Sequence, residues 1–106
     1  MKSPDPAVLQ ALVDGIVNAV HPIRIVLFGS GARAAMHVGS DLDLMVVVPD
    51  GTHRRRTAQT IYASIRGLRV PFDVVVATPS DLARYGDHAG LIYRTILEQG
   101  RAVYAA

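Results

Sequence analysis

The fold of this chain is decided by two apolar runs joined through a short polar link, Ile25-Val-Leu-Phe-Gly-Ser-Gly-Ala-Arg33 and Ser40-Asp-Leu-Asp-Leu-Met-Val-Val-Val48. The first run ends at Gly29-Ser30, and the second opens with Asp41 and Asp43, two residues apart. Side chains alternate along a strand, so both aspartates are expected to point to the same side. Two acids beside a glycine-serine turn are typical of a site for a divalent cation and a phosphate.

Length and composition indicate one folded domain over residues 1–106. The chain is 50% hydrophobic and 19% charged, which argues against disorder. It has no cysteine, so disulfides, thiolate zinc sites and cysteine nucleophiles are excluded. The net charge of +2 does not indicate a nucleic-acid partner. No signal-peptide region opens the chain, and no apolar run reaches membrane-spanning length. We expect a cytoplasmic protein with no direct contact to membrane or nucleic acid.

Hydrophobic spacing and turn residues predict a chain of helices and strands. Helices are expected in the ranges 6–20, 31–37, 53–66, 79–86 and 91–99. Asp5, Ser30, Thr52 and Thr78 are expected at the starts of the first four, and Gly100 after the end of the last. Strands are expected in the ranges 23–28, 42–48, 70–77 and 102–104. The strands are apolar on both faces, which is typical of a sheet covered on both sides. The helices are expected to cover one face fully, and a partner chain is a candidate cover for the other.

Three aspartates lie at or near the starts of apolar strands: Asp41 and Asp43 in the second strand, and Asp73 in the third. An ionised carboxylate without a partner is costly in apolar surroundings. Mg²⁺ prefers hard oxygen ligands and is held by carboxylates together with substrate phosphates. The alternative is that these acids form salt bridges with Arg24 or Arg69. Because three acids accompany a phosphate-type turn, we favour the magnesium site.

The Gly29-Ser30 turn is the candidate phosphate-binding element. Glycine lets the backbone approach a phosphate closely, and the N–H groups at the start of the following helix attract an anion. Ser30 adds a hydroxyl donor, and Arg33 is a candidate phosphate ligand or a partner in a surface salt bridge. His37 is near enough in sequence to contact a substrate, whereas the other three histidines are expected at the surface or as caps. Arg54–Arg56 are predicted to form a solvated helix face, with an acidic or phosphate-bearing partner as the alternative.

A competing interpretation is a dinucleotide-binding fingerprint, Gly29-x-Gly31-x-x-Ala34, with Asp50 about twenty residues further along the chain. Gly39 leaves room for barely two helical turns after the fingerprint, and this interpretation gives the three aspartates no role. A Walker A loop is excluded because no Gly-Lys-Ser or Gly-Lys-Thr follows the turn.

The whole pattern resembles that of a known superfamily. Gly29-Ser30, then ten residues, then Asp41-x-Asp43 is similar to the signature of the polymerase-β-like nucleotidyltransferases. The flanking residues look like the smallest branch, the minimal nucleotidyltransferases, and similar patterns at Asp73–Val76 and Glu98–Tyr104 extend the resemblance over nearly the whole chain. The resemblance implies an α+β fold with an αβαβαβ core, in which a small mixed sheet is flanked by helices.

The resemblance also implies an activity. Asp41 and Asp43 would hold two Mg²⁺ ions on the triphosphate of ATP, and Asp73 would share one ion and help to orient or deprotonate an attacking hydroxyl. Gly29, Ser30 and Arg33 would bind phosphates, and attack on the α-phosphate would release pyrophosphate. The chain has no room for an acceptor-binding domain, so the acceptor is expected on another polypeptide. Members of this branch are commonly antitoxins of HEPN-domain ribonuclease toxins.

The leading hypothesis is therefore a magnesium-dependent antitoxin that transfers AMP from ATP to a hydroxyl, expected to be a tyrosine, of a HEPN-type toxin with which it forms a hetero-oligomer. Two alternatives stay open: a catalytically weak antitoxin that acts by direct binding, and a nucleotidyltransferase that acts on a small-molecule hydroxyl. Ala34 stands where the branch usually has glycine. If that position needs a positive φ angle, nucleotide binding is weakened, which favours the first alternative.

Overall fold

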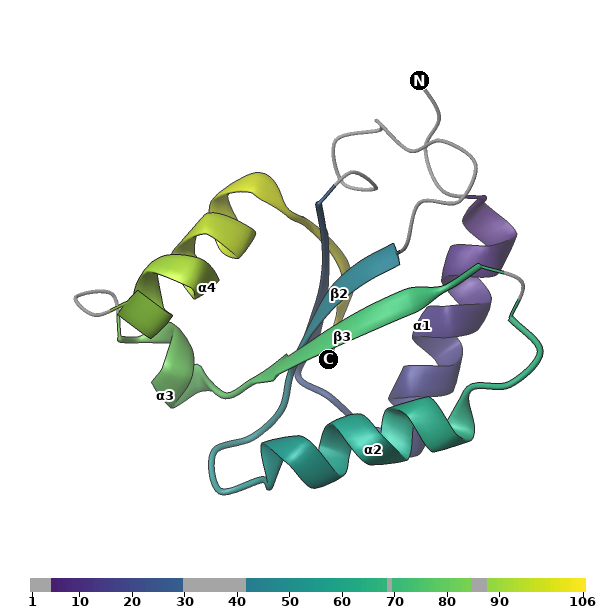
Figure 1. Ribbon diagram of the computed structural model, residues 1–106, viewed down its shortest axis with the longest axis horizontal. Coiled ribbons are helices and arrows are strands. Elements are labelled where there is room, and N and C mark those ends of the chain that lie inside the picture. Colours follow the sequence, from purple (N-terminus) through teal and green to yellow (C-terminus); the bar gives the residue numbers. More distant parts are fainter. Residues whose placement is uncertain (1–4, 30–41, 69, 85–87) are drawn as a thin grey trace.

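The computed structural model describes residues 5–29, 42–68, 70–84 and 88–106, which form four helices and four strands (Figure 1). In chain order these are α1 (Pro6–Val20), β1 (Arg24–Phe28), β2 (Leu42–Val47), α2 (Arg54–Ser64), β3 (Phe72–Ala77), α3 (Pro79–Leu82), α4 (His88–Gln99) and β4 (Arg101–Ala105). The strands and the long helices lie where hydrophobic spacing predicts them. The short helix expected at 31–37 falls outside the described residues.

The four strands form one mixed sheet in the order β3-β2-β1-β4. β1 runs antiparallel to both β2 and β4, whereas β2 and β3 are parallel. Parallel neighbours need a crossover connection, and α2 supplies it between β2 and β3. The structure therefore confirms the α+β class and the small mixed sheet flanked by helices.

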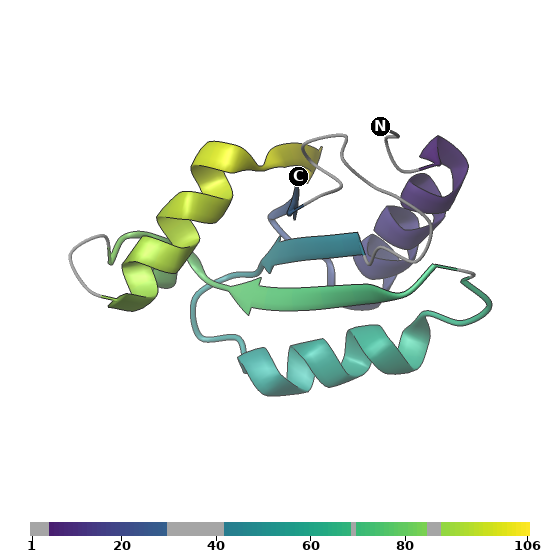
Figure 2. The ribbon, with the colours of Figure 1, turned by 45° about the horizontal axis from the view of Figure 1, so that its top comes forward.

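Helices pack on both faces of the sheet. Leu42, Leu44 and Val46 of β2 are buried in a core that includes residues of α1 and α2. The alternate residues Met45 and Val47 are buried on the opposite face together with Ile96 of α4. Figures 1 and 2 show the sheet lying between α4 and the pair α1 and α2. The expectation that helices would fully cover only one face is therefore wrong for this part of the sheet.

The helix starts show how local sequence sets the boundaries. The Asp5 carboxylate accepts a hydrogen bond from the Ala7 N–H (2.9 Å), which confirms the predicted cap of α1. The cap of α2 is His53 and not Thr52 as predicted: the His53 Nδ1 accepts the Arg56 N–H at 3.1 Å. Thr52 belongs instead to the preceding turn, where its N–H donates to the Pro49 carbonyl at 3.2 Å.

Two helices are shorter than predicted. α2 ends at Ser64 because Ile65 adopts an extended backbone, and Ile65 then packs against the core between the sheet and α1. α3 is a single turn with a capping box, in which Thr78 and Asp81 each bind the backbone N–H of the other. Asp81 also accepts a hydrogen bond from Arg54 at 3.1 Å, so the start of α2 is tied to α3.

We expect Gly100→Ala to lower the free energy of unfolding by about 1–3 kcal/mol. An added Cβ would lie 2.5 Å from the Ile96 carbonyl oxygen and 3.0 Å from the Leu27 carbonyl oxygen. Both are backbone atoms, so relief requires the last turn of α4 to distort for the Ile96 contact and the chain to move away from β1 for the Leu27 contact. The neighbouring exposed Gln99 provides the control, since Gln99→Ala is expected to change stability by less than about 0.5 kcal/mol. Equal denaturant midpoints for the two variants would contradict this packing.

Candidate functional site

Two of the three predicted metal ligands lie side by side. Asp43 and Asp73 are register partners in the parallel pair of β2 and β3, and neighbouring strands are about 4.8 Å apart. Each follows a residue whose side chain packs toward α1 and α2, namely Leu42 and Phe72. Because side chains alternate, both carboxylates point to the opposite face of the sheet. Asp73 is exposed and Asp43 is half-buried, so the pair is open to solvent and to a ligand.

This pair of carboxylates is suited to a divalent cation. Two ionised acids on adjacent strands repel each other, and a cation between them removes that repulsion. Mg²⁺ is commonly held by one or two carboxylates while substrate phosphates and water complete its octahedral shell. The donor set therefore fits magnesium. Within the described ranges no cluster reaches three potential ligands, since Asp41, the third predicted ligand, lies just outside them.

Gly29 adjoins the carboxylate pair at the end of β1. Its neighbour Phe28 pairs with Asp43 across the antiparallel strands, so the chain leaves β1 beside the Asp43 carboxylate. The φ angle of Gly29 is +72°, a left-handed conformation that favours glycine. The structure thus brings Gly29, Asp43 and Asp73 together at one end of the sheet. The other predicted residues of this region, Ser30, Arg33 and His37, lie outside the described residues, as does Ala34.

The salt-bridge alternative for Asp43 gains no support from Arg24, the one of its two proposed partners that the structure describes. Arg24 pairs with Val47, four residues along β2 from Asp43, which places its backbone about 13 Å away along the strand. Only fully extended side chains could span that separation. Arg69, the other proposed partner, falls outside the described residues.

The dinucleotide-binding alternative is wrong. That fingerprint requires the glycine turn and the acid to follow two parallel strands, so that both lie at the same end of the sheet. β1 and β2 are antiparallel, which puts Asp50 at the opposite end from Gly29. Asp50 instead accepts a hydrogen bond from the Ser80 N–H at 3.0 Å and joins the turn after β2 to the start of α3.

Tyr62 of α2 supports the strand that carries Asp73. β3 is an edge strand, and the Tyr62 hydroxyl accepts a hydrogen bond from the Val74 N–H at 2.9 Å. The Tyr62 ring also stacks on Phe72, with the centroids 5.3 Å apart and the planes 19° apart. The residues on both sides of Asp73 are therefore held to α2. The Tyr62 side chain is 45% exposed, and its role depends on the register of β3, which local sequence does not show.

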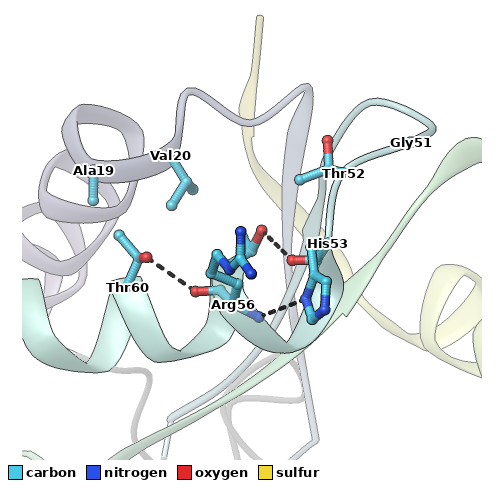
Figure 3. Close-up of a pocket in the computed structure, with 8 residues that line it drawn as sticks. Ala19, Val20, Gly51, Thr52, His53, Arg56 and Thr60 are labelled. Atoms are coloured by element: carbon cyan, nitrogen blue, oxygen red, sulfur yellow. Dashed lines mark hydrogen bonds between the residues drawn. The ribbon is translucent and has the colours of Figure 1, made fainter.

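A shallow hollow lies away from this site, where the end of α1 meets the start of α2 (Figure 3). His53, Arg56 and Thr60 line it. Two hydrogen bonds join these residues to one another: the Arg56 N–H donates to the His53 ring, and the Thr60 hydroxyl donates to the Arg56 carbonyl at 2.9 Å. The hollow is on the α1 and α2 side of the sheet, whereas Asp43 and Asp73 face the other side. It is therefore separate from the candidate site.

A family comparison matches residues 11–103 to a model described as a nucleotidyltransferase domain. The chain belongs to the nucleotidyltransferase domain family. The match spans all four strands except the last residues of β4, and it includes Gly29, Asp43 and Asp73. No curated protein sequence gave a significant match.

Two solved structures share this fold. A proposed nucleotidyltransferase from Sulfolobus solfataricus aligns with 93% of this chain and 78% of its own, at a TM-score of 0.64 and 15% identity. A mutant of the toxin–antitoxin pair MntA–HpeT aligns over 94% of this chain and 72% of its own, at a TM-score of 0.55 and 20% identity. These likenesses confirm the nucleotidyltransferase fold. No helix in the described ranges is both long and apolar enough to span a membrane.

We expect Asp50→Asn to destabilise this nucleotidyltransferase most above about pH 4. Hydrogen bonds from the backbone and side chain of Ser80 lower the pKa of Asp50 in the folded state. Because the pKa of Asp50 is lower in the folded than in the unfolded state, its ionised carboxylate stabilises the fold at pH values above the unfolded pKa. That stabilisation is lost as the pH falls through the folded pKa. The denaturant midpoints of the wild type and of Asp50→Asn should therefore differ at pH 6 and converge as the pH is lowered. A constant difference over the whole range would contradict this role for Asp50.

We expect Tyr62→Phe to lower the free energy of unfolding by about 0.5–1.5 kcal/mol and to speed hydrogen exchange at the Val74 amide. The substitution removes the hydroxyl acceptor but keeps the ring stacked on Phe72. Tyr104→Phe is the control, because it removes a hydroxyl from β4 on the far edge of the sheet. Unchanged exchange at Val74 would show that the hydroxyl does not hold β3.

Proposed function

We propose that this nucleotidyltransferase transfers AMP from ATP to a hydroxyl of a partner protein in a magnesium-dependent reaction. The observation that carries the proposal is the pairing of Asp43 with Asp73 beside Gly29, in a chain that belongs to the nucleotidyltransferase family. Two adjacent carboxylates suit a cation, and a glycine that lets the backbone approach closely suits a polyphosphate. A pair of acids with a purely structural role would not need such a glycine beside it.

Each residue has a distinct part in the proposed reaction. Asp41, Asp43 and Asp73 are the proposed magnesium ligands, and Gly29, Ser30 and Arg33 the proposed phosphate contacts. Bound Mg²⁺ would supply positive charge to the phosphates. The acceptor oxygen bonds to the α-phosphorus, the bond to pyrophosphate breaks, and the hydroxyl proton passes to Asp73. Asp73 suits that task because it is the exposed member of the pair and is accessible to an acceptor.

We propose a HEPN-type toxin as the acceptor protein, with a tyrosine as the acceptor. The fold shared with an MntA–HpeT toxin–antitoxin structure supports a toxin as partner. That structure carries two Asp-to-Glu substitutions two residues apart, the same spacing as Asp41 and Asp43 here. A partner protein also explains how an exposed aspartate is shielded from water during transfer.

The test is to incubate the chain with a candidate HEPN-type toxin, Mg²⁺ and ATP labelled at either the α- or the γ-phosphate. We expect the α-label, and not the γ-label, to reach the partner. Asp41→Asn/Asp43→Asn should slow labelling at least about a hundredfold, because lost metal charge stabilisation is worth several kcal/mol. Asp14→Asn, which removes an acid from the exposed side of α1, should leave the rate within about twofold.

The alternatives give different results in the same assay. A partner that stays unlabelled, and that the double variant still neutralises, would favour an antitoxin acting by binding alone. Labelling of a small hydroxylated molecule without the partner would favour the small-molecule enzyme. Transfer of the γ-label would contradict nucleotidyl transfer altogether.

A further inference from the structure

We propose that Gly29 is a positioning residue for Asp43, because its missing Cβ leaves the space in which the Asp43 carboxylate lies. A Cβ built on Gly29 would be 2.6 Å from Asp43 Oδ2, 3.5 Å from Cγ and 3.6 Å from Cβ. The first distance is far inside van der Waals contact, so any other residue at position 29 displaces the carboxylate. The proposal rests on the proposed function in one respect, namely that the carboxylate position matters for a metal ion.

Two described residues adjoin the Asp43 carboxylate, namely Gly29 at the end of β1 and Asp73 on β3. A shift toward Asp73 brings two like charges closer, which raises their repulsion. The residues that flank Asp43 in β2, Leu42 and Leu44, are fully buried, so their packing opposes a compensating shift of the backbone. A shift of the carboxylate therefore changes the spacing of the two acids, and a shift toward Asp73 also costs stability.

Position 29 requires glycine for two separate reasons. Its backbone has a left-handed conformation, at φ +72°, and the Asp43 carboxylate occupies the space that a Cβ would fill. Gly67 supplies a matched control, since its φ is +74° and a Cβ built on it meets nothing within 4 Å. Alanine at Gly67 thus introduces the same backbone strain without the contact.

A double-mutant cycle in thermal unfolding, without metal or nucleotide, tests the contact alone. We expect Gly29→Ala to lower the melting temperature by about 4–8 °C more than Gly67→Ala. In an Asp43→Ala background the contact is gone, so the two alanine substitutions should lower it equally. The proposal is overturned if the two substitutions have equal effects in the wild type, or if the difference persists without the Asp43 carboxylate. A role for Gly29 limited to phosphate contact predicts no such coupling, because no phosphate is present.

The effect of Gly29 on metal affinity is measured separately, by titrating the protein with Mn²⁺ as a spectroscopic substitute for Mg²⁺. We expect Gly29→Ala to weaken Mn²⁺ binding by about tenfold or more, and Gly67→Ala to leave it unchanged. Gly29→Ala protein that binds Mn²⁺ as tightly as the wild type would overturn the positioning role. A wild-type chain that binds no Mn²⁺ would instead contradict the proposed function, while the unfolding cycle still decides whether Gly29 makes room for Asp43.

Discussion

The parallel register of β2 and β3 is the constraint on which the candidate site depends. It sets Asp43 beside Asp73 on adjacent strands, with both carboxylates on one face of the sheet. β2 is a central strand whose residues Leu44 to Val47 are almost completely buried. A slip of one residue would turn Asp43 into the apolar core beside α1 and α2, where an unpaired carboxylate is costly, and this cost fixes the position of Asp43.

The crossover from β2 to β3 fixes the position of Asp73. α2 is anchored at its start by the contact of Arg54 with Asp81, and toward its end Tyr62 holds β3 through Phe72 and the Val74 N–H. The same helix contributes Ile61 to the main core, and Ile65, which follows the helix, packs against that core as well. The apolar core and the polar contacts therefore both hold the strands that carry the two acids.

Much of this arrangement could be predicted from the sequence. The apolar run in 42–48 and the glycine after Phe28 locate the strands and the turn, and the two-residue spacing of acids points to a cation. The pairing of Asp43 with Asp73 could be expected only as a consequence of the family resemblance, because strand order is not visible in local patterns. The close approach of Gly29 to Asp43 was missed, since the sequence suggests only that glycine allows a phosphate near the backbone.

Other parts of the structure are set by tertiary contacts that no local pattern encodes. Thr52 is a better helix cap than His53 by residue type, but Thr52 closes the turn after β2 and the helix starts one residue later. The role of Tyr62 has no local signal, because its partner, the Val74 N–H, becomes available only when β3 is an edge strand. The antiparallel pairing of β1 with β2 likewise removes Asp50 from the site.

The most direct test of the central claim is nuclear magnetic resonance of the isotope-labelled chain during addition of small amounts of Mn²⁺. A paramagnetic ion broadens the amide signals nearest to it. We predict that the signals of Gly29, Asp43 and Asp73 broaden first, and that Asp43→Asn abolishes this selectivity. Broadening that begins at other acids, such as Asp81 or Glu98, or that is uniform over the chain, would contradict a metal site at the paired carboxylates.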